Sequence, residues 1–99
     1  MLYNKIMVVG TCKIKLRLFS PNSLKEKRKI IKSLIERLKN KFNISIAEVE
    51  DNDLWQSSVI GIAVVSNDSI FADEVINKVL NFIENFNDVE IIECDIEML

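Results

Sequence analysis

The segment Ser20–Asn43 constrains the fold more than any other part of the chain, because it reads as one amphipathic helix with a marked start. Ser23 and Glu26 have the three-residue spacing of a capping box, in which each side chain bonds a backbone N–H that the first turn leaves unpaired. Apolar residues then recur at three- and four-residue intervals and form one stripe, which comprises Leu24, Ile31, Leu34, Ile35, Leu38 and Phe42. We therefore expect a helix that ends near Asn40–Asn43 and packs its stripe against a partner surface.

Charge divides the chain into two unlike halves at Lys41. Residues 1–41 hold 12 of the 13 basic residues and 2 of the 15 acidic residues, a net charge of +10, whereas residues 42–99 hold 1 basic and 13 acidic residues, a net charge of -12. This asymmetry indicates either a basic surface for a polyanion or two halves that neutralise one another in the fold.

Alternating sequence predicts a strand near each end of the chain. In Ile6–Phe19 the apolar residues alternate with Lys13, Lys15 and Arg17, and in Val89–Leu99 the inward residues Ile92, Cys94, Ile96 and Met98 alternate with Glu93, Asp95 and Glu97. We expect these strands to lie antiparallel with their bases facing their acids, and each opposed pair contributes about 0.2–1 kcal/mol. Cys12 and Cys94 would then both be core thiols. The strand cations are thereby neutralised, and the first helix keeps its charge.

Two further strands and a second helix lie between them. Ile44–Glu50 predicts a strand with a bulge near Ile46, because its apolar positions shift from even to odd numbers. Val59–Ser66 is apolar on both faces, which predicts a central strand or one covered by another chain. Asn67–Ser69 offers caps for a helix that ends near Asn85. The order predicts one α+β domain over residues 1–99, with a ferredoxin-like four-stranded antiparallel sheet and two helices on one face.

The opening turns of the first helix form a candidate anion- or nucleic-acid-binding site. Its residues are Lys25, Lys27, Arg28, Lys29 and Lys32, of which Lys27 alone falls inside the apolar arc. Cations at this positive pole of the helix dipole cost about 0.3–1 kcal/mol each when exposed, and a phosphate at the first-turn N–H groups would offset that cost. The alternatives are a solvated face whose long side chains cover the edge of the core, and a contact with a protein partner.

The segment between the second and third strands holds two further candidates. Four acids, Glu48, Glu50, Asp51 and Asp53, have the ligand chemistry for Mg²⁺ or Ca²⁺ but lack the glycine and closing glutamate of a calcium loop, so we expect no metal. A turn with solvated carboxylates, or a contact with the basic helix of a second subunit, is the alternative. Asp53, Trp55 and Gln56 form the candidate protein interface, because a loop tryptophan is typical of an anchor; a base-stacking platform is the other interpretation.

The sequence lacks the residues that several classes of function usually require. The sequence contains no histidine, and its two cysteines have no metal-ligand spacing, which argues against a zinc site of ordinary type and removes the commonest catalytic base. No phosphate-binding loop and no nucleophile paired with a base occurs, so we expect no cofactor and no enzymatic activity. The apolar run Ile6–Val9 is too short for a signal peptide or a membrane span. We therefore expect a cytoplasmic protein with reduced thiols and no membrane partner.

Four short segments are distinctive in combination, namely Ser23–Arg28, Phe42–Val49, Asp53–Gln56 and Val64–Asp68. Together they resemble the YlxP-like family of small bacterial proteins of unknown function, and the resemblance covers nearly the whole chain in order. It implies a ferredoxin-like fold. Members are often encoded beside translation and ribosome-maturation factors, which implies a role with RNA or the ribosome, and the family offers no catalytic residue to carry over.

These observations lead to one functional expectation with two competitors. We expect a non-enzymatic RNA- or ribosome-associated protein that contacts phosphates through its basic first helix. The first competitor is a homodimer or protein-partner module without nucleic-acid binding, which the doubly apolar third strand and the acidic segment would serve. The second is a binder of small anions or nucleotides at the start of the first helix.

Overall fold

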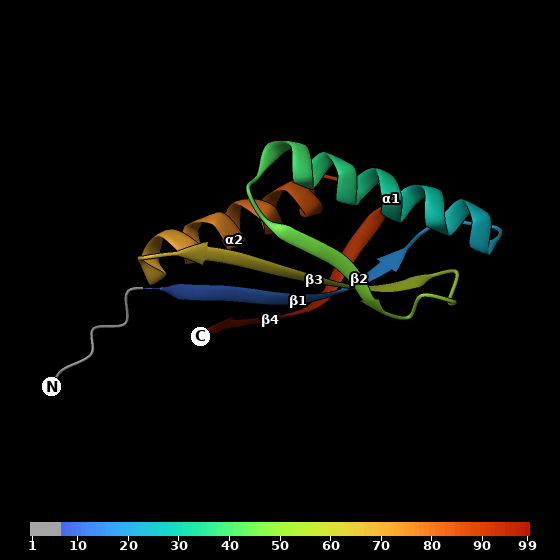
Figure 1. Cartoon of the computed structure of the whole chain (residues 1–99). Helices are drawn as coiled ribbons and strands as arrows, with labels where there is room; N and C mark the ends of the chain where they lie inside the picture. Colours follow the sequence, from blue (N-terminus) through green and yellow to red (C-terminus); the bar gives the residue numbers. More distant parts are fainter. Residues whose placement is uncertain (1–6) are drawn as a thin grey trace, which may run out of the picture.

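The computed structural model describes residues 7–99, which form one antiparallel sheet covered on one face by two helices (Figure 1). The elements follow in the order β1 (Val8–Leu18), α1 (Leu24–Lys41), β2 (Ser45–Glu50), β3 (Ser57–Ser66), α2 (Ser69–Glu84) and β4 (Val89–Met98). The strand order in the sheet is β2-β3-β1-β4, and every pairing is antiparallel. The predicted ferredoxin-like α+β arrangement is therefore confirmed. Ile6, the predicted start of the first strand, lies outside the described residues.

Both helices begin at the predicted caps. The Ser23 hydroxyl accepts a hydrogen bond from the Glu26 N–H at 3.1 Å, and the Asp68 carboxylate accepts one from the Ile70 N–H at 2.9 Å. These side chains satisfy backbone donors that have no partner inside the helix. The caps thus fix where each helix starts.

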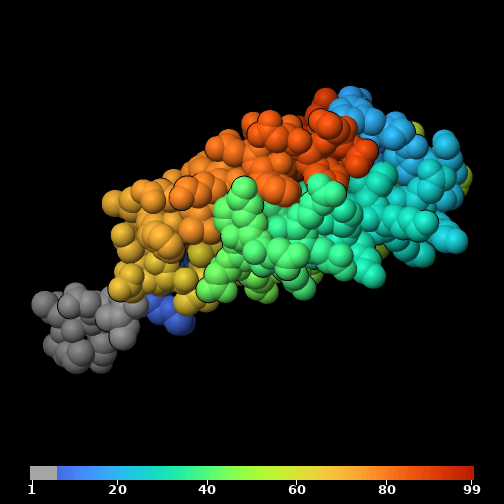
Figure 2. Space-filling model, turned by 90° about the horizontal axis from the view of Figure 1, so that it is seen from above, coloured from blue at the N-terminus to red at the C-terminus, as the bar shows by residue number. Residues whose placement is uncertain are grey.

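The two helices are staggered along the molecule. α2 packs on β1, β3 and β4, whereas α1 packs on β2 and meets α2 near its own C-terminal end, where the Lys41 ammonium lies 5.4 Å from the centre of the Phe82 ring. The first turns of α1 consequently project past α2, toward the loop that joins β2 to β3 (Figure 1). Seen from above, α1 (cyan to green) lies beside α2 (orange), and no other segment covers its outer surface (Figure 2).

The pairing of β1 with β4 is as predicted, but its register shifts at one end. Because the register shifts between Lys15 and Leu16, Arg17 faces Glu90, whereas unshifted pairing would place Ile91 opposite it. Arg17 consequently forms an ion pair with Glu90 at 3.1 Å, and Lys13 pairs with Glu50 of β2 rather than with its neighbour on β4. Lys15 forms no ion pair with residues 7–99. The opposed residues are Thr11 with Glu97, Lys13 with Asp95, Lys15 with Glu93, and Arg17 with Glu90.

The predicted bulge in β2 is misplaced. It lies between Glu48 and Glu50 rather than near Ile46. The reason is that Glu48 continues the even-numbered, helix-facing positions and sits opposite Ile60 of the core, while Ala47 is exposed. The inward position of the strand is occupied by a carboxylate, so the apolar residues alone gave the wrong place for the bulge.

The two thiols lie in different environments. Cys12 is 1% exposed, as predicted, and burial raises the pKa of its thiol from 9.0 to about 11, with smaller contributions from Cys94 and Asp95. Cys94 is opposite Ile14 and so shares its helix-side face, yet Cys94 is exposed because β4 is an edge strand. The prediction that Cys94 is a core thiol is wrong.

β3 has an inner place in the sheet, between β2 and β1. Ile60, Ile62 and Val64 are buried beneath the helices. On the face without helices, called the open face below, Gly61 and Ala63 line a hollow with a volume of about 610 Å³. The predicted central position is confirmed, and it pairs both edges of β3 without covering the open face.

Candidate functional site

Lys27 is turned into the interior instead of joining the predicted anion-binding residues. Its side chain is fully buried, because position 27 lies on the same stripe of α1 as Ile31. The ammonium Nζ donates to the backbone oxygens of Asp51 at 2.7 Å and Asn52 at 3.2 Å, and it pairs with the Glu48 carboxylate at 2.7 Å. An ammonium has three donors, so these contacts leave none for a phosphate. Lys27 therefore does not belong to an anion-binding surface in this fold.

The carboxylate that pairs with Lys27 is itself held in place. Glu48 Oε2 accepts a hydrogen bond of 2.5 Å from the hydroxyl of Ser58, which is fully buried. Burying two charges is costly unless the pair is well placed and its remaining polar atoms are bonded. No buried side-chain nitrogen or oxygen in the described part of the chain lacks a partner. The network is thus complete, and it ties α1 to β2 and β3.

The same network fixes the hairpin loop, residues 51–56 between β2 and β3. Asp51 has a φ of 61°, in the left-handed region, and its carboxylate accepts a hydrogen bond of 2.6 Å from the Ser57 hydroxyl. Asp53 approaches the Arg28 guanidinium at 3.5 Å. The loop is therefore anchored to α1 by the buried Lys27, with a weaker exposed contact from Arg28, and Asp51 ties it to the start of β3.

Acidic residues of β2 and the hairpin loop form ion pairs within the same chain. They were predicted to be solvated, or to meet the basic helix of a second subunit. Instead Glu48 pairs with Lys27, Asp53 approaches Arg28, and Glu50 pairs with Lys13. Within residues 7–99 no group of three or more acidic or cysteine side chains is placed to hold a metal ion.

The exposed cations of α1 form a lysine row, which we define as Lys25, Lys29, Lys32 and Lys39. All four are exposed, and none forms an ion pair with residues 7–99. Positions three, four and seven apart share one face of a helix, and 14 residues rise by roughly 21 Å. Glu36 is the acidic residue that interrupts this face. The row presents unneutralised ammonium groups on the outer surface of the helix layer, which Figure 2 shows uncovered.

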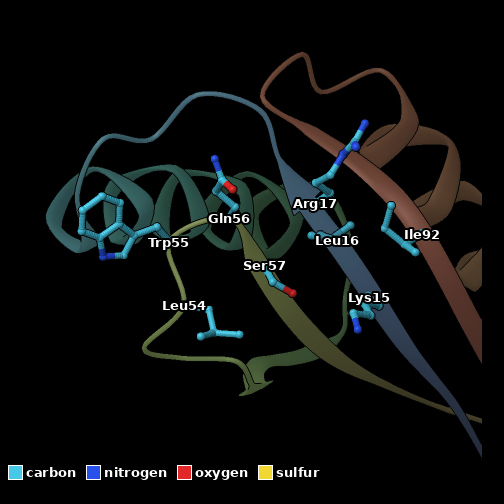
Figure 3. Close-up of a pocket in the computed structure, with 8 residues that line it drawn as sticks. All are labelled: Lys15, Leu16, Arg17, Leu54, Trp55, Gln56, Ser57 and Ile92. Carbon is cyan, nitrogen blue, oxygen red and sulfur yellow. The ribbon is translucent and has the colours of Figure 1, made fainter.

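The three predicted interface residues Asp53, Trp55 and Gln56 are all exposed in the hairpin loop. Trp55 and its neighbour Leu54 are each 52% exposed. They border an open hollow of about 730 Å³, called the tryptophan hollow below (Figure 3). Its lining consists of Lys15, Leu16, Arg17, Leu54, Trp55, Gln56, Ser57 and Ile92.

The sequence analysis did not predict that residues distant in sequence would line this hollow together. Ile92 was predicted to point inward, but the register shift in β4 leaves it opposite no residue of β1 and 48% exposed. Lys15 and Arg17 were assigned to charge pairing alone. The alternation of β1 does place both side chains on the open face, and this was the sequence feature that could have indicated their part in the hollow.

Comparison with known proteins assigns the family. Residues 9–96 match the family described as "Protein of unknown function (DUF503)". The chain belongs to this family. It is 36% identical over 83 residues to the "Uncharacterized protein YlxP" of Bacillus subtilis (strain 168), an alignment that spans 84% of this chain and 90% of that relative. The resemblance to YlxP-like proteins is thus confirmed.

A solved structure shares the fold alone. The de novo designed protein Foldit4 superposes with a TM-score of 0.54 and 15% sequence identity, covering 94% of this chain and 96% of that one. None of the helices within residues 7–99 has the length and apolar character that crossing a membrane requires.

Proposed function

We propose that the protein is a non-enzymatic RNA- or ribosome-associated binding protein that contacts phosphates through the lysine row of α1. The observation that carries this proposal is that no lysine of the row forms an ion pair with the described residues, although Glu36 lies on the same face. Nearby carboxylates of β2 and of the hairpin loop have other partners, since Glu48 pairs with the buried Lys27 and Asp53 with Arg28. The row therefore keeps its charge for a polyanion.

The chemistry of the row favours phosphate over base recognition. A lysine ammonium is a compact point charge on a flexible stem, so it binds phosphate oxygens without reading a base edge. A row of roughly 21 Å spans several phosphates of a nucleic-acid strand. The row also begins at the positive pole of the α1 dipole, which adds to the attraction. Recognition of RNA by shape and charge fits this surface better than recognition of sequence.

Salt dependence and charge reversal test the proposal. Four phosphate contacts predict a log–log slope of affinity against salt of roughly -3. Lys25→Glu, Lys29→Glu, Lys32→Glu and Lys39→Glu together should abolish binding of labelled RNA in a fluorescence anisotropy titration. The matched single changes are Lys29→Glu in the row and Lys78→Glu on α2, which alter net charge equally, and only the first should weaken binding. Unchanged affinity after the fourfold reversal would show the proposal to be mistaken.

A second candidate function is homodimerisation through the open face of the sheet. It is favoured by Val49 and Val65, which are 50% and 66% exposed beside the hollow over Gly61 and Ala63. Val65→Glu should then lower the molecular mass measured by light scattering at high concentration. A monomeric mass at every concentration would remove this candidate, while a dimer remains compatible with RNA binding by α1.

A further inference from the structure

The hairpin loop carries exposed apolar side chains on a backbone that is hydrogen-bonded at several points. Trp55 and Leu54 are both more than half exposed, yet the loop that carries them is bound at several points. Lys27 donates to the carbonyls of Asp51 and Asn52, and the Gln56 carbonyl accepts the Leu18 N–H at 2.9 Å. A surface whose binding groups are already ordered loses less conformational entropy when a ligand binds. The loop is therefore built like a preorganised binding element.

The composition of the tryptophan hollow defines the ligand that it suits. Leu54, Trp55 and Ile92 supply apolar surface, while Lys15 and Arg17 supply two cations, and no acidic residue is part of the lining. Gln56 adds an amide that both donates and accepts hydrogen bonds. Figure 3 shows Trp55 and Gln56 on one side of the hollow, and Arg17 and Ile92 on the other. A planar aromatic group attached to an anion matches this set.

The cations of the hollow remain accessible to such an anion. Lys15 forms no ion pair with the described residues, although Glu93 lies opposite it in the ladder and a neighbouring hollow places it near Glu50, Asp51 and Asp95 as well. Arg17 forms one exposed ion pair, with Glu90, in which the side chains are 57% and 46% exposed, and its guanidinium lies 5.5 Å from the centre of the Phe19 ring. Exposed pairs of this kind are weak, so a phosphate can compete for the guanidinium.

We propose that the tryptophan hollow binds one unpaired nucleotide of single-stranded RNA. The base stacks on the Trp55 indole, the Gln56 amide bonds the edge of the base, and Lys15 and Arg17 receive the adjoining phosphate. This inference rests on the proposed function, and it adds a preference for unpaired segments that the lysine row by itself does not supply. The loop anchored by Lys27 and Arg28 connects the two surfaces.

A second copy of the chain is a poorer occupant of the hollow. A two-fold symmetric contact places the same patch of both copies together. Lys15 and Arg17 would then approach their equivalents in the partner, and like charges brought together across an interface oppose binding. An anionic ligand avoids this repulsion.

The single tryptophan of the chain gives a direct readout. We expect a single-stranded hexaribonucleotide to quench Trp55 fluorescence and to bind more tightly than a duplex of the same sequence, whose bases are already stacked. Trp55→Ala should weaken binding of the hexamer by about 5- to 150-fold, the range for removing one base stack. Trp55→Phe should restore part of this loss, whereas Trp55→Leu should not, because only an aromatic ring stacks.

The matched control is Phe71→Ala on α2, which removes an aromatic side chain of nearly equal exposure, 53% against 52% for Trp55. It should leave RNA affinity unchanged. Equal affinity of wild type and Trp55→Ala for the hexamer would overturn the inference. A shift of Trp55 emission with protein concentration in the absence of RNA would also overturn it, because a second copy would then occupy the hollow.

Failure of the proposed function gives a different pattern. If the fourfold lysine reversal leaves duplex and single-strand affinity intact, the lysine row is not the phosphate-binding surface. Quenching of Trp55 by the hexamer, lost in Trp55→Ala, would still support the hollow as the nucleotide site. The two ideas are therefore tested separately.

Discussion

Replacing Lys27 by methionine tests how strongly α1 is tied to the sheet, because the change removes a buried charge and keeps a long, unbranched side chain. The variant loses the ion pair to Glu48 and the hydrogen bonds to the carbonyls of Asp51 and Asn52. Breaking a buried pair by removing one partner costs about 3–5 kcal/mol. Glu48 keeps its bond from Ser58, and its side chain is 14% exposed. We therefore expect the lower end of that range, about 3 kcal/mol.

Urea unfolding followed by far-ultraviolet circular dichroism measures this loss. A domain of this size is typically stable by about 5–15 kcal/mol, so the variant should remain folded without denaturant. A loss of about 3 kcal/mol lowers the midpoint by about 1–3 M urea at the slopes usual for small domains. The matched control is Lys25→Met, at an exposed position two residues earlier on α1, which should change stability by less than about 0.5 kcal/mol.

A double-mutant cycle isolates the pair itself. Glu48→Gln removes the other charge while keeping the shape and an acceptor for Ser58. Combining it with Lys27→Met leaves no uncompensated charge, so the two losses should sum to more than the measured double loss, by about 2 kcal/mol. A loss below about 1 kcal/mol for Lys27→Met, or additive losses in the cycle, would refute the argument that this ion pair holds α1 in place.

Three further changes test other parts of the fold. Gly10→Ala should destabilise the protein by about 1–3 kcal/mol in urea unfolding, since a Cβ there would lie 3.1 Å from that of Ala72, and an unchanged midpoint would contradict the close approach of β1 and α2. Ser23→Ala should cost about 1 kcal/mol by removing the N-cap, whereas Ser23→Asp should not. The pKa of Cys12 is raised to about 11 by burial, so its contribution to stability is complete below about pH 9 and is lost as the pH rises toward 11. Cys12→Ala should flatten this decline in the free energy of unfolding, and a parallel decline in both proteins would argue against it.

The elements could be predicted from the sequence because local signals agree with the fold. The Ser23 cap and the apolar stripe place α1, and the alternation of β1 identifies its two faces. These signals depend on neighbours within a few residues of one another. They are therefore readable without knowledge of the tertiary structure.

The candidate site was only partly predictable, because its main polar contacts join distant residues. Lys27 fell inside the apolar arc of the helix, and Glu48 stands at an inward position of β2, so each broke the pattern of its own element. Each was interpreted by its charge alone, as an anion ligand and as a solvated acid. The structure explains both exceptions together, because Lys27 and Glu48 form one buried ion pair. Two such breaks in separate elements are a signal for a buried pair that sequence analysis can use.

The tryptophan hollow depends on features that pattern alone does not reveal. The position of Ile92 results from a register shift, and shifts of one residue move a side chain to another face. Exposure of Trp55 depends on how the hairpin loop is anchored. Predicting the position of Ile92 and the exposure of Trp55 requires the arrangement of three strands and a helix in space.

The inner place of β1 has a consequence for the order of folding. β1 is made first among the described strands, but one of its two hydrogen-bonded edges is filled only by β4, whose residues end at Met98. Contacts between residues so far apart in sequence form slowly, because a long loop must close before they can stabilise the chain. During synthesis, the edge of β1 thus stays open until nearly all described residues have emerged, and this interval is when the chain is most exposed to wrong strand pairing.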